Sequence, residues 1–263
     1  MNTTSVQVLL YVLILGGFAF SVVVELLNLK NIQTEVPPEF TDVYDQEKYK
    51  KSQQYLIENT KFDFISGGVS TLLLVLFIAF NGFAKLDVIL RAHIESDLWR
   101  GLAFIGILGL LNFIVGLPFG LYETFVIEEK YGFNKMTFKT WLGDTIKGII
   151  LAIILGGFVL GFLLWFFQKF ELAWIYAFLF VIAFQLFVMF VAPVTIMPLF
   201  NKFTPLEDGE LKRSIEDFAK QQNFVLSGIF KMDGSKRSTK ANAYFTGFGK
   251  FRRIVLFDTL IEK

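Results

Sequence analysis

Cysteine is absent from this 263-residue sequence, and histidine occurs once, at His93. The lack of cysteine excludes disulfide bonds, thiol catalysis and thiolate metal ligands. A catalytic zinc ion usually has two or three histidine ligands, so His93 could form such a site only with carboxylate partners. An excess of one charge is also missing, because 25 Lys and Arg residues accompany 24 Asp and Glu residues. This balance predicts no nucleic-acid partner.

Apolar side chains are abundant instead: hydrophobic residues form 54% of the sequence, and 33 residues are Phe. A transmembrane helix needs about 20 apolar residues to cross the hydrocarbon layer of a bilayer. Windows without charge predict such helices at about residues 6–24, 64–84, 101–122, 148–168 and 172–192. Pro193 and Pro198 predict that the last helix ends near Val191 and that an irregular segment follows it. The predicted fold class is a polytopic α-helical membrane protein with five transmembrane helices.

The basic residues predict how these helices are oriented. Of the 25 Lys and Arg residues, 21 lie in the segments after the first, third and fifth predicted helices. The remaining four lie on the opposite side: Lys85, Arg91, Arg100 and Lys169. Because Lys and Arg accumulate in cytoplasmic segments, the N-terminus is predicted outside and the C-terminus in the cytoplasm.

Two polar regions are predicted outside the bilayer. Residues 31–61 read as a loop with a short amphipathic helix around residues 45–58. Residues 204–263 follow the membrane domain (1–203) and begin a small, incomplete cytoplasmic α+β domain. Thr204, Pro205 and Glu207 have the spacing of a helix start, with the helix ending near Gln222. Runs typical of strands follow at 225–232, 243–248 and 254–257, the last two as a hairpin, and Thr259-x-x-Glu262 predicts another helix start.

Polar residues near the predicted helices each have two interpretations. Asn112 and Gln185 lie near the middles of their helices, and Asn81 lies deep in the second. Their amides need partners in lipid, either on a neighbouring helix or in a water-filled interior. His93 is predicted in an exposed loop. The carboxylates Glu123, Glu128 and Glu129 are predicted at a solvated helix end, since no nucleophile or metal ligand accompanies them.

Four segments together resemble a known family. They are residues 122–135, 192–206 and 253–260, and the segment Gly234-Ser-Lys-Arg-Ser-Thr-Lys-Ala-Asn-Ala-Tyr-Phe-Thr-Gly247. All closely resemble the type I CAAX prenyl endopeptidases, which are integral-membrane zinc metalloproteases. The resemblance extends over essentially the whole chain from the first predicted helix onward.

The resemblance implies a barrel of seven helices around a water-filled chamber, closed on the cytosolic side by a zinc peptidase domain. It implies removal of the C-terminal tripeptide from prenylated CAAX proteins. Asn112 and Gln185 would line the chamber. Asn242, Ala243 and Tyr244 match the strand whose edge would bind the peptide substrate. The family's zinc is held by two His of H-E-x-x-H and a later Glu.

The H-E-x-x-H motif, expected after residues 259–263, is absent from this sequence. The chain is therefore expected to be a fragment or a truncated product that has no metal or catalytic residue and is inactive alone, with zinc only in a full-length relative. Its partners are expected to be the lipid bilayer, a peptide or prenylated-protein substrate in that relative, and further copies of itself. Turnover of other membrane proteins is an equally open role. The alternative is a noncatalytic membrane scaffold or a small-solute channel.

Overall fold

The computed structural model describes residues 3–262, and most of them are helical. Five helical stretches in this range are long and apolar enough to cross a membrane: Ser5–Lys30, Gln46–Ala79, Asp97–Lys130, Phe138–Lys169 and Ala173–Leu199. Large apolar side chains stay exposed along them, such as Phe20, Leu72, Leu110 and Phe178. Lipid covers such side chains in a membrane protein, so the predicted fold class is confirmed. Internal contacts divide the chain into two units, one ending at Tyr131 and one beginning at Gly132.

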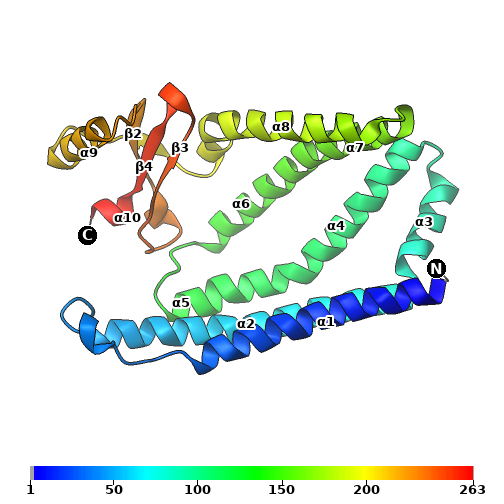
Figure 1. Ribbon diagram of the computed structural model, residues 1–263, viewed down its shortest axis with the longest axis horizontal. Helices are drawn as coiled ribbons and strands as arrows, with labels where there is room; N and C mark the ends of the chain where they lie inside the picture. The colour runs from blue at the N-terminus through cyan, green and yellow to red at the C-terminus, as the bar shows by residue number, and fades with distance from the viewer. Residues whose placement is uncertain (1–2, 263) are drawn as a thin grey trace. The chain divides into compact units, whose positions relative to one another are not determined.

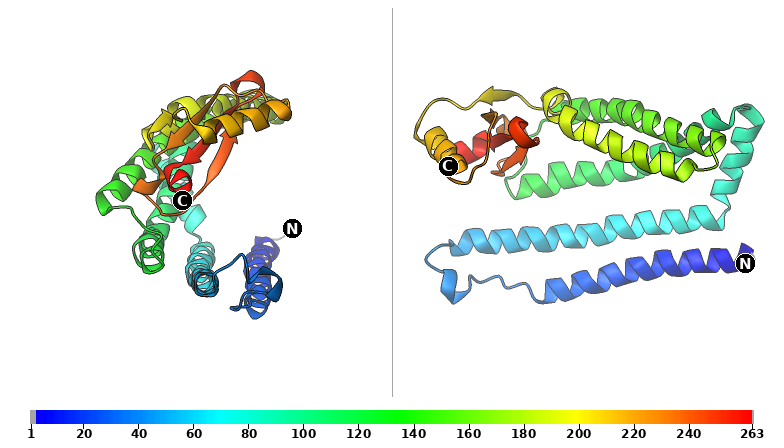
Figure 2. Two further views of the ribbon diagram at one scale, coloured as in Figure 1. Left: turned by 90° about the vertical axis from the view of Figure 1, so that its left-hand side faces the viewer. Right: turned by 45° about the horizontal axis from the view of Figure 1, so that its top comes forward.

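The first unit consists of helices. Helix α1 (Thr3–Lys30) and helix α2 (Gln46–Ala79) lie side by side (Figures 1 and 2). A short 3₁₀ turn, η1 (Pro38–Phe40), lies in the loop between them. Helices α3 (Gly82–His93) and α4 (Asp97–Tyr122) follow, and a π-helical turn, η2 (Glu123–Ile127), connects α4 to α5 (Glu128–Lys130).

Three sequence predictions are wrong in this unit. Asn81 is not deep in the second membrane helix but lies between α2 and α3, with a left-handed backbone (φ 55°). The amphipathic segment at 45–58 is not a separate short helix but the start of α2, where the Asp45 carboxylate accepts a hydrogen bond from the Lys48 amide (2.9 Å). No Gly or Pro occurs between Asp45 and Gly67, so the helix continues into the bilayer segment. His93 is exposed as predicted, but it lies in the last turn of α3 instead of a loop.

In the second unit, α6 (Phe138–Leu151), the π-helical turn η3 (Ala152–Gly156) and α7 (Gly157–Lys169) form one long helical stretch. Helix α8 (Ala173–Thr195) packs along α7 (Figure 2), with the rings of Phe162 and Phe180 stacked at 5.1 Å. The predicted end of this helix near Val191 is wrong. Pro193 lies inside α8, because a missing amide two residues before a helix end removes only one hydrogen bond.

A four-stranded sheet follows the 3₁₀ turn η4 (Met197–Leu199). Its strands are β1 (Phe203–Pro205), β2 (Gly228–Met232), β3 (Ala243–Thr246) and β4 (Arg253–Phe257), in the order β1-β2-β4-β3. Strands β2 and β4 are parallel, and the other two pairs are antiparallel. Helix α9 (Glu210–Gln221) packs on the sheet through Ile215, against a core of Leu206, Ile229 and Leu256. Helix α10 (Asp258–Ile261) follows β4, and the turns η5 (Gly234–Lys236) and η6 (Gly249–Phe251) flank β3.

The sheet confirms the three predicted strand runs and the hairpin of β3 and β4, but the predicted helix start at Thr204 is wrong. Pro205 ends β1, and α9 begins at Glu210. The Leu206 amide donates to the Ile229 carbonyl (2.9 Å), and its side chain is buried in the core. Pairing with β2 therefore prevails over the local capping signal. The last helix begins one residue before Thr259, whose hydroxyl instead donates to the Lys240 carbonyl.

Candidate substrate-binding edge

Strand β3 lies at an edge of the sheet formed by the described residues, and its backbone groups alternate in direction. The Phe257 amide donates to the Asn242 carbonyl (3.0 Å), so these two residues form a hydrogen-bonded pair just before β3. Opposite residues in an antiparallel ladder alternate between hydrogen-bonded and non-hydrogen-bonded pairs. Ala243, opposite Leu256, belongs to the second kind. The N–H and C=O of Ala243 therefore point away from β4, toward the open edge, and those of Phe245 do the same.

One of the edge-facing backbone groups, the Ala243 amide, already has a hydrogen-bond partner. The side-chain oxygen of Asn242 accepts a hydrogen bond from the Ala243 amide (2.8 Å). Both residues are exposed. An incoming extended peptide would compete with this side chain for the Ala243 amide, and the released Asn242 side chain would then offer both a donor and an acceptor. Asn242 and Ala243 thus lie at the open edge of the sheet, and their role in peptide binding stays a prediction.

Tyr244 has a different environment from its two neighbours. Its side chain is half-buried, with the hydroxyl 3.6 Å from the Met197 sulfur and 3.9 Å from the Met232 sulfur. Burial raises the pKa of this phenol above its ordinary value. Tyr244 also lines a cavity of about 100 Å³ between the sheet and the end of α8 with the turn that follows it. The Tyr244 side chain therefore attaches β3 to that turn. Its backbone N–H and C=O face β4, so Tyr244 offers no hydrogen-bonding group to the open edge.

The loop that leads into β3 is fastened at its start by Asp258. This buried carboxylate accepts hydrogen bonds from the Ser235 hydroxyl, the Ser235 amide (2.8 Å) and the Thr259 amide (2.8 Å). Burial raises the pKa of Asp258, but the hydrogen bonds from Ser235 and Thr259 outweigh it, so the pKa lies below its ordinary value. One carboxylate thus joins the turn η5 to the start of α10.

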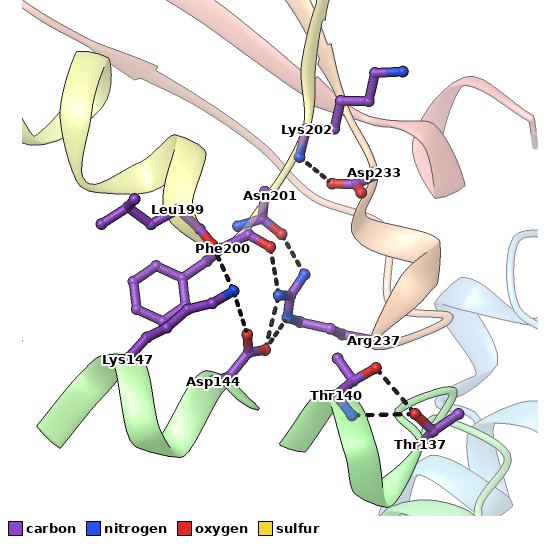
Figure 3. A network of polar contacts seen from close by, with 10 residues as sticks. All are labelled: Thr137, Thr140, Asp144, Lys147, Leu199, Phe200, Asn201, Lys202, Asp233 and Arg237. Atoms are coloured by element: carbon purple, nitrogen blue, oxygen red, sulfur yellow. Dashed lines mark hydrogen bonds and ion pairs between the residues drawn. The ribbon is translucent and has the colours of Figure 1, made fainter. Parts of the chain in front are cut away.

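Farther along the same loop, Arg237 contacts helix α6 and the segment that follows α8 (Figure 3). Its guanidinium donates to Asp144 of α6 (Nε to Oδ2, 2.8 Å), to the Asn201 side chain (2.7 Å) and to the Phe200 carbonyl. Lys147 of α6 lies 3.7 Å from Asp144 and donates to the Leu199 carbonyl (2.7 Å). Sequence reasoning did not find this contact, because Asp144 and Arg237 are 93 positions apart.

The comparisons with known proteins agree with this fold. The family model described as "CAAX prenyl protease N-terminal, five membrane helices" matches residues 25–202, and that of peptidase family M48 matches residues 205–263. The chain belongs to the M48 family of CAAX prenyl proteases.

Relatives of the family are similar along most of the chain. CAAX prenyl protease 1 of Saccharomyces cerevisiae is 44% identical over 244 residues, covering 88% of this chain and 53% of that protein. The human homolog is 38% identical, covering 88% of this chain and 50% of that protein. The crystal structure of S. mikatae Ste24p is 39% identical with a TM-score of 0.89, covering 98% of this chain and 62% of that one. The chain spans about half the length of the curated relatives it matches.

The residues of this M48 family member do not fit a zinc centre within the described range. Between residues 3 and 262, no three His, Asp or Glu side chains lie close enough to hold a metal ion. His93 is exposed, and its Nδ1 lies 2.8 Å from the Ile89 carbonyl. No catalytic step through a metal follows from these residues. The expectation that zinc belongs to a full-length relative stays a prediction.

The predicted chamber residues lie in different units. Asn112 is on α4 in the first unit, and Gln185 is on α8 in the second. Both side chains are exposed within the described chain. An exposed amide on a membrane helix faces lipid, water or a neighbouring helix. The assignment of both residues to a water-filled chamber therefore stays a prediction.

The carboxylates after α4 form contacts that the sequence did not indicate. The Tyr55 hydroxyl donates to Glu128, so the predicted solvated helix end is instead joined to α2. Glu58 of α2 accepts from Lys130 (2.7 Å) and from the Tyr131 hydroxyl (2.7 Å). Burial and the Glu58 carboxylate raise the pKa of Tyr131 to about 12. These pairs hold the end of this helical stretch against α2.

Proposed function

We propose that this chain supplies the membrane domain (1–203) and the beginning of the peptidase domain (204–263) of a zinc metalloendopeptidase that processes prenylated CAAX proteins. The open edge of β3 supports this proposal most directly, in a chain with five membrane-spanning stretches and an M48 family match. The sequence contains no H-E-x-x-H motif. The proposal therefore assigns peptide binding, and not hydrolysis, to residues of this chain.

Substrate recognition proceeds through the backbone in this proposal. An extended peptide adds a strand to β3 and pairs with the edge-facing N–H and C=O groups of Ala243 and Phe245. Asn242 releases the Ala243 amide and contacts the peptide instead. Main-chain pairing accepts varied side chains, which suits an enzyme that processes more than one protein sequence. Selectivity then depends on the prenyl group and on the pockets beside the edge.

The membrane domain positions that edge relative to the lipid-anchored part of the substrate. We propose that Asn112 and Gln185 line a water-filled interior, because lipid offers no partner to an amide. The N-terminus lies outside and the sheet lies in the cytoplasm, as the distribution of 21 of the 25 basic residues favours. The many exposed apolar helix faces also favour association between copies of the chain when lipid is removed.

A chimera tests the proposal. Residues 1–263 replace the matching half of the S. cerevisiae CAAX prenyl protease 1, and the purified protein is incubated with a farnesylated peptide that ends in a CAAX box. The proposal predicts release of the C-terminal tripeptide, and loss of release when a chelator removes the metal. A folded chimera that binds zinc but releases no tripeptide, beside an active parent enzyme, contradicts it.

A further inference from the structure

A partly buried ion pair connects the loop before β3 to helix α6. Arg237 and Asp144 have side-chain exposures of 18% and 19%, and the guanidinium reaches the carboxylate through both Nε (2.8 Å) and Nη2 (2.8 Å). The side-on contact uses two of the five donors of Arg237, and two more bond to the Asn201 side chain and to the Phe200 carbonyl (Figure 3). One side chain therefore joins the β3 loop to α6 and to the segment after α8.

The backbone around Arg237 is fixed to the segment that precedes α6. The Lys135 amide donates to the Arg237 carbonyl (3.0 Å), and the Thr239 amide donates to the Phe133 carbonyl (3.0 Å). The Thr239 hydroxyl adds a bond to the Gly132 carbonyl (3.0 Å). Asp258 holds the other end of the same loop through Ser235. The chain enters β3 only a few residues later, so these contacts leave the strand little freedom to move relative to α6 and α8.

We infer that Arg237 is a positioning residue, which through Asp144 sets the place of the β3 edge relative to the ends of α6 and α8. The inference rests on the proposed function, since it gives this placement a role in peptide cleavage. Arg237 is suited to the task because its planar guanidinium binds a carboxylate in one orientation, whereas an ammonium group is a point charge without that constraint.

The placement matters because a prenylated substrate is held at two points. Its lipid stays with the membrane domain, while its backbone pairs with β3. An extended chain advances about 3.3 Å per residue, so a comparable shift of the edge brings a different bond to the reacting position. A soluble peptide without the lipid is held at one point and follows the edge when the edge moves. Loss of the ion pair should therefore impair cleavage of the prenylated peptide far more than cleavage of its unprenylated counterpart.

The chain itself allows a test of the placement that needs no catalysis. Because the sequence has no cysteine, Lys139→Cys on α6 and Lys231→Cys on β2 provide the two spin labels, and both positions are exposed. We expect a narrow distance distribution for the parent chain and a broadened or displaced one for Arg237→Gln and Asp144→Asn. Lys236→Gln is the matched control: it removes the same charge from the same loop, at an exposed side chain with no contact among those described. An unchanged distribution in Arg237→Gln overturns the inference.

The role in cleavage is tested with the same variants in the chimera. For Arg237→Gln we expect kcat/KM for the farnesylated peptide to fall by about 100-fold, the scale of an ångström-sized misplacement. The unprenylated peptide should lose much less, Arg237→Lys should recover part of the loss, and Lys236→Gln should match the parent. The double variant with Asp144→Asn should be no worse than Arg237→Gln alone, because the two side chains act as one unit.

Equal losses for both peptides indicate a merely structural pair and overturn the positioning role. If the parent chimera cleaves neither peptide, the proposed function fails and so does the cleavage role, while the distance measurement still decides the placement.

Discussion

The membrane helices and the sheet of this protein are stabilised in different ways. The long helices satisfy their backbone groups internally and leave large apolar side chains such as Leu72 and Phe178 for lipid to cover. The sheet has a core of only a few buried residues, among them Ile229 and Leu256, and a loop held by polar side chains. A single substitution on a lipid-facing helix surface should therefore change the stability of the protein little. A substitution in the sheet core or its polar loop should destabilise the sheet and displace β3.

The largest contrast between these regions is their location relative to the bilayer. Ser5→Cys in α1 and Ser214→Cys in α9 replace exposed residues in a protein without other cysteines. In sealed vesicles of one orientation, an impermeant thiol reagent should label one position from the outside and the other only after the vesicles are opened. Labelling of both positions from the same side contradicts the predicted five-helix topology.

Core packing gives the next largest difference. Ile229 is buried in the sheet core, and its replacement by Ala should lower the free energy of unfolding of the sheet by about 2–5 kcal/mol. Leu186→Ala on α8 is the comparison, because Leu186 is exposed in the described chain and its truncation leaves no buried cavity. Pulse proteolysis in detergent with denaturant measures both. Equal effects at the two positions contradict the distinction between the regions.

The polar anchors of the sheet should have a smaller effect that depends on pH. Asp258→Asn should destabilise the sheet by about 1–3 kcal/mol, because the Ser235 and Thr259 donors lose the charged acceptor that the buried Asp258 provides. The folded pKa of Asp258 is depressed, so its stabilisation is complete above the ordinary carboxyl pKa of 3.8 and is lost as the pH falls below it. Amide hydrogen exchange of Ser235 across this range measures the loss. A variant with the same pH dependence as the parent contradicts the role of Asp258.

These regions also differ in how much their sequences reveal. A membrane span depends on the apolarity of consecutive residues, so composition alone predicted the five helices. The amphipathic pattern predicted that a helix begins near residue 45, but not that it continues into the membrane span. The local capping signal at Thr204 failed, because Pro205 pairs with Phe230 of β2. To predict that the Ala243 N–H faces the open edge, one needs the strand order of the sheet. The Arg237–Asp144 pair joins residues that are 93 positions apart. Neither can be derived from residues close in sequence.

The backbone edge at Ala243 carries the proposed function, and one substitution tests it most directly. Proline at position 243 removes the edge-facing N–H without disturbing the ladder to β4, since Ala243 makes no hydrogen bond across that pair and proline is tolerated at sheet edges. Ala243→Gly is the matched control, because it keeps the amide. In the chimera we predict that Ala243→Pro loses most of its cleavage of the farnesylated peptide while it keeps its zinc content and unfolding temperature, and that Ala243→Gly stays close to the parent. A folded, zinc-loaded Ala243→Pro protein that cleaves at the parental rate contradicts the assignment of this edge.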